Sequence, residues 1–379
     1  MEIKNDAVLV VGTGIAGMGA GMLLAESGHR VYLLDAAPAI GGSMHLLDHT
    51  FADNSCGICL MLPRQPSFCP TFSCEHHPNV TLLPYTELTD LAGQAGAFTA
   101  AVRHKPRYVD PARCNGCGEC AAVCPVPRPH DHEGWVSPVK AIYRPPGLRA
   151  VPDAWVIDPA YCTRCGACVT ACPTQAIDLE MQPHEEALAV GAVLLTPGFA
   201  PFDARKKGEY GYRLYDNVLT SLEFERMVSL AGSSVAHLSR PSGDKVPRRI
   251  AFLQCVGSRD ELHGSGHCSL VCCMYTAKQI AIAKRLAPDL DVTVFFMDVR
   301  AFGKDYETYV ARVQALPGVT YRRPCHPSST SRSRRAICCS RTSARMAGCV
   351  RRPSTWPFWR LGSPRRPGFR PWPAAWGWS

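Results

Sequence analysis

The start of the chain alternates apolar runs with glycines in the order of a βαβ unit. Ala7–Val11 is a short apolar run that leads directly into G-T-G-I-A-G, and a small-residue segment of helical character extends to about Ser27. A second apolar run, Val31–Leu34, ends at Asp35. This succession predicts a strand, a helix and a strand, and therefore an α/β chain.

The glycines of this unit occupy the positions that a bound dinucleotide requires. Gly12 permits a tight turn after the strand, and Gly14 lets the backbone approach a pyrophosphate at the helix N-terminus. Gly17 allows the helix to pack closely on the strand. Asp35 is expected to bind ribose hydroxyls, so the pattern predicts a dinucleotide-binding domain.

Three later segments extend this prediction. The loop A-P-A-I-G-G, which holds Gly41 and Gly42, resembles the loop after the acid in flavoproteins with two dinucleotide-binding domains, which favours FAD over NAD. Val80–Val102 indicates short antiparallel strands. Val190–Thr196 predicts a buried strand that ends in a turn at Gly198; either it returns to the FAD, or it is an ordinary core strand.

Two four-cysteine motifs carry the strongest chemical signal. Each has three closely spaced cysteines and a fourth before proline, as in bacterial ferredoxins. Because C-x-x-C-x-x-C surrounds one cluster while the fourth thiolate reaches the other, the motifs predict two [4Fe-4S] sites, with zinc or disulfides as the alternatives. The expected ligands are Cys114, Cys117, Cys120 and Cys172 at the first site, and Cys162, Cys165, Cys168 and Cys124 at the second.

A second strand, helix and strand begin near Arg248. R-R-I-A-F-L-Q-C predicts the first strand, Met274–Leu286 the helix and Val292–Met297 the second strand. Where a nicotinamide-binding domain has glycines, this chain has C-V-G-S-R-D and C-S-L-V-C-C, so a third metal site at this strand end is one hypothesis. Lys278 is expected to be solvated, with a place beside the flavin as the alternative. The candidate metal ligands are Cys255, Cys268, Cys272 and Cys273.

The remaining cysteines and the apolar content bear on compartment. Cys56 and Cys59 form an isolated C-x-x-C, for which a redox or ligand role is one hypothesis, while Cys69 and Cys74 are expected to be buried or incidental thiols. No run approaches the roughly 20 apolar residues that span a membrane. Because the paired motifs explain eight of the 20 cysteines as cluster ligands, we expect a reducing cytoplasm.

The net charge of +9 is concentrated in the tail. Residues 322–379 hold 13 of the 41 basic residues and no acid, so the first 321 residues carry a net charge of −4. A nucleic-acid-binding function, which would use this tail, is disfavoured. The tail also has eight prolines and five of the seven tryptophans, but no lysine and no apolar periodicity. We predict that it is poorly packed, and its composition is typical of a shifted reading frame in GC-rich DNA.

From about Ala7 to Tyr321 the chain resembles the iron-sulfur flavoprotein of heterodisulfide reductase, which is the A subunit of that enzyme. The resemblance rests on V-V-G-T-G-I-A-G, on T-P-G-F after the ferredoxin motifs, on S-L-E-F-E-R, on C-V-G-S-R-D with C-S-L-V-C-C-M-Y, and on M-D-V-R-A-F-G-K. It implies an α/β fold: an FAD-binding, thioredoxin-reductase-like core with an inserted α+β two-cluster ferredoxin module. It also implies that Cys255, Cys268, Cys272 and Cys273 hold a third [4Fe-4S] cluster.

The resemblance further implies an oxidoreductase subunit that transfers electrons through FAD and three [4Fe-4S] clusters and acts only within a complex. Its expected partners are other redox subunits, either heterodisulfide reductase B-like or C-like subunits or hydrogenase or dehydrogenase subunits. A non-catalytic electron carrier or scaffold without flavin is the alternative. The expected parts are 1–105 and 180–245 for FAD, 106–179 for the ferredoxin module, 246–321 for a degenerate second dinucleotide-binding domain with the third cluster, and 322–379 for the aberrant tail.

Overall fold

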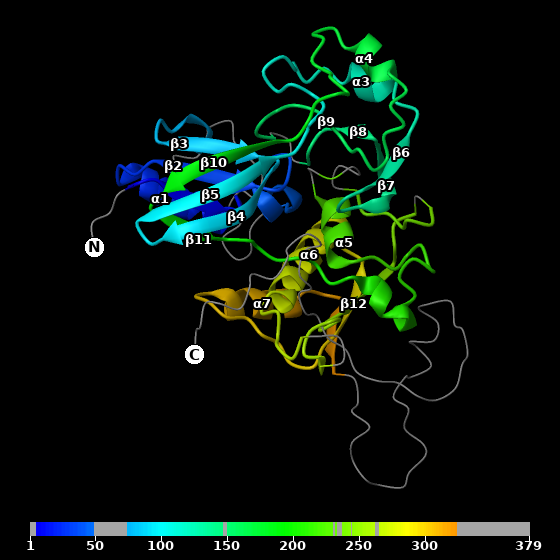
Figure 1. Ribbon diagram of the computed structural model, residues 1–379. Coiled ribbons are helices and arrows are strands. Elements are labelled where there is room, and N and C mark those ends of the chain that lie inside the picture. Colours follow the sequence, from blue (N-terminus) through cyan, green and yellow to red (C-terminus); the bar gives the residue numbers. More distant parts are fainter. Residues whose placement is uncertain are drawn as a thin grey trace. The chain divides into compact units, whose positions relative to one another are not determined.

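The computed structural model of the chain describes residues 5–48, 74–146, 150–229, 232, 237–243, 245–261 and 265–323. The chain divides into two compact units (Figure 1). Unit 1 comprises residues 1–50, 54–198 and 225–235, and unit 2 comprises residues 51–53, 199–224 and 236–379. The predictions for Cys56, Cys59, Cys69 and the tail beyond Arg323 lie outside the described residues.

Unit 1 is built on a parallel sheet with the strand order β11-β1-β2-β3 (Figure 1). As the sequence pattern predicts, β1 (Val8–Val11) and β2 (Val31–Asp35) are joined by helix α1 (Ile15–Glu26). The remaining strands are β3 (Val80–Pro84) and β11 (Ala192–Leu195). Because the strand order reverses beside β1, the carboxyl ends of β1 and β11 form the edge where such sheets bind ligands.

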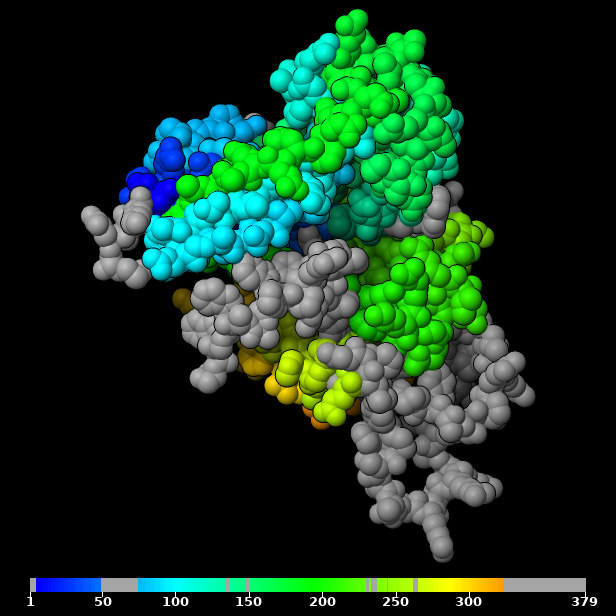
Figure 2. All heavy atoms as spheres, in the orientation of Figure 1, coloured from blue at the N-terminus to red at the C-terminus, as the bar shows by residue number. Residues whose placement is uncertain are grey.

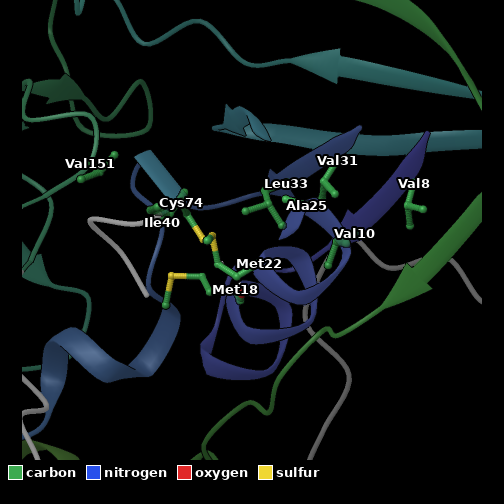
Figure 3. Close-up of a cluster of buried hydrophobic side chains, with 10 residues drawn as sticks. All are labelled: Val8, Val10, Met18, Met22, Ala25, Val31, Leu33, Ile40, Cys74 and Val151. Atoms are coloured by element: carbon green, nitrogen blue, oxygen red, sulfur yellow. Dashed lines mark hydrogen bonds between the residues drawn. The ribbon is translucent and has the colours of Figure 1, made fainter. Parts of the chain in front are cut away.

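Helix α1 packs on this sheet through an apolar core (Figure 3). A Cβ atom on Gly21 would lie 2.7 Å from the Leu33 side chain, which shows how closely the helix approaches. Cys74 is fully buried in this core, as expected for a thiol without a ligand role. The core consists of Val8, Val10, Met18, Met22, Ala25, Val31, Leu33, Ile40, Cys74 and Val151.

A second, antiparallel sheet of unit 1 has the order β10-β5-β4. It contains β4 (Thr86–Gln94), β5 (Ala97–His104) and β10 (His184–Val190), so the predicted antiparallel strands are confirmed, although Val80–Pro84 joins the parallel sheet. Side chains of both sheets share one core, made of Ala7, Leu9, Leu34, Leu83, Ala100, Val102, Leu188 and Val190.

The prediction of a single buried strand over Val190–Thr196 is wrong. The chain changes sheets at Gly191, where a Cβ atom would lie 1.9 Å from the Asn5 carbonyl oxygen. Val190 ends antiparallel β10, whereas β11 pairs with β1 in parallel. Strand β11 lies at the sheet edge, and Leu195 is 52% exposed. The apolar run is therefore shared between two sheets, and its second half is not buried.

The segment between β5 and β10 forms the ferredoxin-type α+β module within unit 1. Its helices are α3 (Glu119–Ala122) and α4 (Ala167–Ala171). Its core joins cysteine side chains with Val109, Ile142 and Ile157. Its strands are β6 (Pro127–His130), β7 (Gly134–Lys140), β8 (Ile142–Tyr143) and β9 (Val156–Ile157).

Arg107 joins this module to the loop after β2. Its Nη1 donates to the Pro38 carbonyl at 2.6 Å, its Nε to the Trp155 carbonyl at 3.0 Å, and its Nη2 to the Ala154 carbonyl at 2.9 Å. Burial lowers the pKa of Arg107 to about 10, so the guanidinium is still charged at neutral pH. Only the fixed fork of arginine reaches three carbonyls from one position.

We therefore expect Arg107→Met to lower the free energy of unfolding by about 3 kcal/mol or more, because it leaves three carbonyl groups without their donor. Arg144→Met is the control in the same module. Arg144 is a partly exposed partner of Asp153, with 2.6 Å between Nη2 and Oδ1, and such pairs contribute about 0–1 kcal/mol. Thermal unfolding midpoints of the two variants measure the difference; equal midpoints would contradict the anchoring role of Arg107.

Unit 2 contains a parallel sheet with the order β12-β13-β14, made of β12 (Arg249–Leu253), β13 (Asp291–Phe295) and β14 (Val319–Arg322). Helices α6 (Cys272–Leu286) and α7 (Tyr306–Gln314) connect these strands. The strand, helix and strand predicted from Arg248 onward are confirmed. Helix α6 begins at Cys272, two residues before the predicted start at Met274. The short 3-10 helices η2 (Ala204–Lys206) and η3 (Gly208–Tyr210) precede α5 (Ser221–Val228) along the chain, and η1 (Gly42–Leu46) belongs to unit 1.

Two predictions for this part of the chain are corrected. Lys278 is not solvated, because it is 2% exposed and lies among the buried residues of α6. Arg322, the first residue of the predicted tail, is ordered as the end of β14 and pairs with Phe295. Among the described residues, no helix has the length and apolarity needed to cross a membrane.

Candidate functional site

The glycine loop after β1 is packed too tightly for side chains. Gly12 has a φ of +103°, and a Cβ atom there would lie 2.1 Å from the Thr196 carbonyl oxygen. A Cβ atom on Gly17 would lie 1.9 Å from the Gly12 carbonyl oxygen. These two glycines therefore let helix α1 and strand β11 approach the end of β1.

Gly14, at the N-cap of α1, faces open space instead. A Cβ atom there would meet nothing within 4 Å, and the first turn of α1 has neither an acidic residue nor a side-chain cap. The exposed N–H groups of such a helix end attract phosphate. The loop after β2 approaches from the other side, because a Cβ atom on Gly42 would lie 2.9 Å from the Gly14 Cα. The Gly41 N–H donates to the Thr13 carbonyl at 2.9 Å.

Asp35 is held by the glycine loop. Its Oδ2 accepts from the Thr13 N–H at 2.8 Å and from the Thr13 hydroxyl at 2.6 Å, and its Oδ1 accepts from the Ala37 N–H at 2.9 Å. A carboxylate accepts about four hydrogen bonds, so one position on Oδ1 remains for a further donor. Thr13 was not predicted as a site residue. The sequence signal that could have indicated it is the hydroxyl side chain between Gly12 and Gly14.

Gly198 follows β11 near the same sheet edge. Its φ is +68°, and nothing lies within 4 Å of the position that a Cβ atom would take. Thr196 fixes the strand end, since its N–H donates to the Val11 carbonyl at 2.8 Å and its hydroxyl donates to the Gly12 carbonyl at 2.8 Å. Thr196 was not predicted either, because its partners lie more than 180 residues away along the chain.

The structure places the paired cysteine motifs around two hollows of the ferredoxin-type module. The first, of about 270 Å³, is lined by Cys114, Cys117, Cys120 and Cys172, together with Val109, Trp155 and Ile177. The second, of about 340 Å³, is lined by Cys162, Cys165, Cys168 and Cys124, together with Ile142, Ile157 and Leu179. Each hollow thus receives its fourth thiol from the other motif, the arrangement that the ferredoxin pattern predicts.

The two motifs share a backbone geometry. Gly116 and Arg164 occupy the same motif position and both have positive φ, at 73° and 55°. Gly118 and Gly166 form the next such pair, at 87° and 79°. These turns direct backbone N–H groups at sulfur: the Arg164 N–H lies 3.4 Å from the Cys162 Sγ. N–H groups aimed at sulfur favour thiolates and clusters that carry negative charge.

The surroundings of individual thiols differ. Burial raises the pKa of Cys120 to about 12. Burial also acts to raise the pKa of Cys172, but hydrogen bonds from the Thr174 hydroxyl and from the Ala176 N–H, at 3.3 Å, outweigh it and the pKa is lowered. Cys120 therefore requires a cation or cluster to be a thiolate at neutral pH.

The third cysteine group lies in unit 2, where β12 ends and α6 begins. Cys255, Cys272 and Cys273 are buried, and Cys268 is half-buried. Hydrogen bonds from the Cys255 and Cys273 thiols lower the pKa of Cys272 to about 3. Donating those bonds, and burial, raise the pKa values of Cys255 and Cys273. Within this group, the hydrogen bonds from Cys255 and Cys273 therefore favour the thiolate form of Cys272.

Two arginines lie close to this cysteine group. Arg259 and Arg300 both pair with Asp298, Arg300 at 2.6 Å between Nη2 and Oδ2. The Cys273 Sγ lies 3.8 Å from the Asp298 carbonyl oxygen, which places this trio beside the thiols. Two guanidinium groups against one carboxylate leave a positive charge that suits a cluster held by thiolates. The trio gives a role to the arginine of C-V-G-S-R-D and to the aspartate and arginine of M-D-V-R, for which the sequence alone indicated none.

Backbone strain gathers at the same place. Cys255, Arg259 and Leu270 have φ values of 59°, 58° and 59°, in the left-handed region that residues other than glycine rarely adopt. Each such residue costs on the order of 1–3 kcal/mol. Strain of this kind persists where the surroundings impose it, and it is typical of ligand-holding loops.

Family models match the ferredoxin-type module and the region of the glycine loop. The 4Fe-4S binding domain family matches residues 107–127 and 155–178. The NAD(P)-binding Rossmann-like domain family matches residues 10–59. Among solved structures, thioredoxin reductases of T. acidophilum and Lactococcus lactis superpose with TM-scores of 0.36 and 0.37, at 13% and 11% identity, over 85% and 84% of this chain and 65% and 64% of theirs.

Curated relatives match most of the chain. One of the iron-sulfur A subunits of CoB-CoM heterodisulfide reductase from Methanopyrus kandleri is 43% identical over 319 residues, and the corresponding A subunit from Methanocaldococcus jannaschii is 42% identical over 319 residues. Each match covers 84% of this chain and 48% of the relative, so the chain spans about half the length of these proteins. Over the matched residues, the chain belongs to the family of iron-sulfur A subunits of heterodisulfide reductase.

Proposed function

We propose that this chain is an electron-transferring oxidoreductase subunit that binds FAD and three [4Fe-4S] clusters and acts within a heterodisulfide-reductase-type complex. One observation carries the proposal. Two hollows lined by four cysteines each lie in the same compact unit as the glycine loop of a dinucleotide site. A chain built this way has a place for a two-electron cofactor and for one-electron centres.

The FAD site is assembled from the two facing glycine loops. Gly12, Gly14 and Gly17 shape the turn and the start of α1, and Gly41 and Gly42 line the opposite loop. The pyrophosphate is expected at the N-terminus of α1, where N–H groups face open space. Asp35 is expected to accept from a ribose hydroxyl through Oδ1, and Gly198 to leave room beside the ring system. FAD supplies the exchange between electron pairs and single electrons; the protein supplies position and local polarity.

The three cysteine groups are the proposed cluster ligands. In the ferredoxin-type module, the crossed fourth thiols Cys124 and Cys172 tie the two sites together. In unit 2, the positive trio of Arg259, Asp298 and Arg300 is expected to offset the negative charge of the third cluster.

The activity and partners of the complete reductase are part of this proposal. The related A subunit from Methanococcus maripaludis belongs by its name to an H(2)/formate:CoB-CoM heterodisulfide,ferredoxin reductase, and 43% identity links it to this chain. By that likeness, the expected partners are heterodisulfide reductase B-like or C-like subunits and hydrogenase or dehydrogenase subunits. Because the electrons would move between cofactors, the proposed activity needs no acid, base or nucleophile from the protein.

Flavin and iron contents of the anaerobically reconstituted full chain test the proposal. We expect one FAD per chain, and clusters that an artificial donor reduces, as visible absorption and electron paramagnetic resonance report. A chain that takes up iron but no flavin would instead be a non-catalytic electron carrier or scaffold.

We also expect that NADH and NADPH do not reduce the isolated chain. A nicotinamide domain needs glycines after its first strand so that a pyrophosphate reaches a helix N-terminus. Here the buried Cys255 occupies that turn, and Cys272 and Cys273 begin α6. Stopped-flow absorption is the measurement, with an artificial donor as the positive control. Flavin bleaching by NADH as fast as by that donor would contradict the proposal and indicate a conventional pyridine-nucleotide oxidoreductase.

A further inference from the structure

Three side chains gather at the neck of the ferredoxin-type module, where the chain leaves and re-enters the sheets of unit 1. His104 is the last residue of β5 before the module, and His184 is the first residue of β10 after it. The two are direct partners in the antiparallel ladder. Figure 1 shows β5 and β10 side by side, and Figure 2 shows their cyan and green atoms at the surface of unit 1. Glu186 is two residues along β10, on the same strand face as His184.

The geometry of this group is close. The rings of His104 and His184 are stacked, with centroids 4.2 Å apart and planes 3° apart. The His104 Nε2 lies 2.9 Å from the Glu186 Oε2. One potential ligand atom from each of the three residues lies within 4.8 Å of the other two. Among the described residues, this is the one group of three histidine, cysteine or acidic side chains whose potential ligand atoms come so close together.

The two ring nitrogens of His104 contact Thr86 on one side and Glu186 on the other. The Thr86 hydroxyl lies 3.1 Å from the Pro84 carbonyl oxygen and 3.1 Å from the His104 Nδ1. A neutral imidazole with its proton on Nδ1 presents a lone pair at Nε2. In that tautomer the Nε2 lone pair lies 2.9 Å from the Glu186 Oε2, and the two atoms can bind one cation together.

We propose that His104, His184 and Glu186 form a binding site for a divalent transition-metal ion of the Zn²⁺ class. Two imidazoles and a carboxylate are a ligand set that Zn²⁺ takes with an open fourth position for water. Imidazole ligands disfavour Mg²⁺ and Ca²⁺, which prefer oxygen. A metal ion binds an imidazole nitrogen in the plane of the ring. Because the rings of His104 and His184 are stacked, one of them has to tilt before both can bind the same ion. His184 can do so, because it is exposed and its side chain donates no hydrogen bond within the described residues.

Such an ion would join the two ends of the inserted module. The 79 residues between His104 and His184 form one long excursion, and a link at its base reduces the entropy lost when the ends come together. Thr86 would orient His104 from behind, in the way that outer partners orient metal-binding histidines. The site is independent of the proposed FAD and cluster ligands, none of which belongs to it.

Equilibrium dialysis of the full chain against Zn²⁺, followed by metal analysis, tests the proposal. Because cysteines also bind Zn²⁺, the difference between matched variants is the measured quantity. We expect His184→Ala and Glu186→Gln each to lose about one equivalent relative to the unchanged chain. Thr86→Val is expected to weaken binding about 10–100-fold. Excess Mg²⁺ should not displace the ion.

Glu185→Gln is the matched control. Glu185 lies on the opposite face of β10 and pairs with Arg103 at 2.9 Å, so its loss removes a surface charge but no ligand. It should retain the full Zn²⁺ content, and Zn²⁺ should raise the thermal unfolding midpoint of this control but not of His184→Ala. Equal Zn²⁺ contents in Glu185→Gln, Glu186→Gln and His184→Ala would overturn the proposal and leave only the direct contact between His104 and Glu186.

Discussion

Replacing Gly17 with alanine is expected to lower the flavin content of the purified chain at least about tenfold. A Cβ atom at this position would lie 1.9 Å from the Gly12 carbonyl oxygen and 2.7 Å from the Thr196 hydroxyl oxygen. Neither contact is relieved by rotation of a long side chain, so α1 must move away from β1. Overpacking of this kind costs about 1–3 kcal/mol, and about 1.4 kcal/mol is a tenfold change in binding.

Gly19→Ala provides the control on the same helix. A Cβ atom there would meet nothing within 4 Å, and alanine stabilises a helix interior by about 1 kcal/mol relative to glycine. This variant should retain its flavin and unfold at the same or a higher temperature. Flavin absorbance per chain after anaerobic reconstitution is the measurement. If Gly17→Ala binds as much flavin as Gly19→Ala, the proposed site at the N-terminus of α1 is wrong.

Replacing Cys255 with serine is expected to reduce the iron content from about twelve to about eight atoms per chain, because three cubane clusters hold four irons each. Cys255 lies in unit 2, while both hollows of the ferredoxin-type module lie in unit 1, so two clusters should survive.

Cys74→Ser is the matched substitution at a buried cysteine outside the proposed sites. Cys74 lies in the core beneath α1, with its Sγ 3.8 Å from the Met18 carbonyl oxygen, and its loss should leave the iron content unchanged. Iron analysis and electron paramagnetic resonance of the reduced proteins compare the two variants. An unchanged iron content in folded Cys255→Ser would remove the third cluster from the proposal.

The alternation of apolar runs and glycines was sufficient to predict one strand, helix and strand of each parallel sheet, namely β1, α1 and β2 in unit 1 and β12, α6 and β13 in unit 2. Short apolar strands, helices between them and turn glycines are local signals, since each depends on a few adjacent residues. The same holds for the backbone turns of the ferredoxin motifs. Gly118 and Gly166 adopt positive φ because their own residue type permits it.

Contacts between distant segments were not predictable in this way. The apolar letters of Val190–Thr196 gave no sign that the chain changes sheets at Gly191, because that change depends on the Asn5 carbonyl group. The burial of Lys278 likewise depends on what packs around α6 and not on its own helix. Arg107 bonds to carbonyls that lie 47 to 69 residues away, so its spacing carried no signal.

By itself, the sequence determined the α/β class, the glycine loop and the grouping of cysteines, because spacing along a short segment decides which residues share a turn or a strand end. Only the tertiary structure decided which carboxylates and imidazoles meet. His104 and His184 stand 80 residues apart, and antiparallel pairing of β5 with β10 brings them together. The register of this pairing depends on how both sheets pack on one shared core. That packing involves the whole unit, so a short stretch of sequence does not predict it.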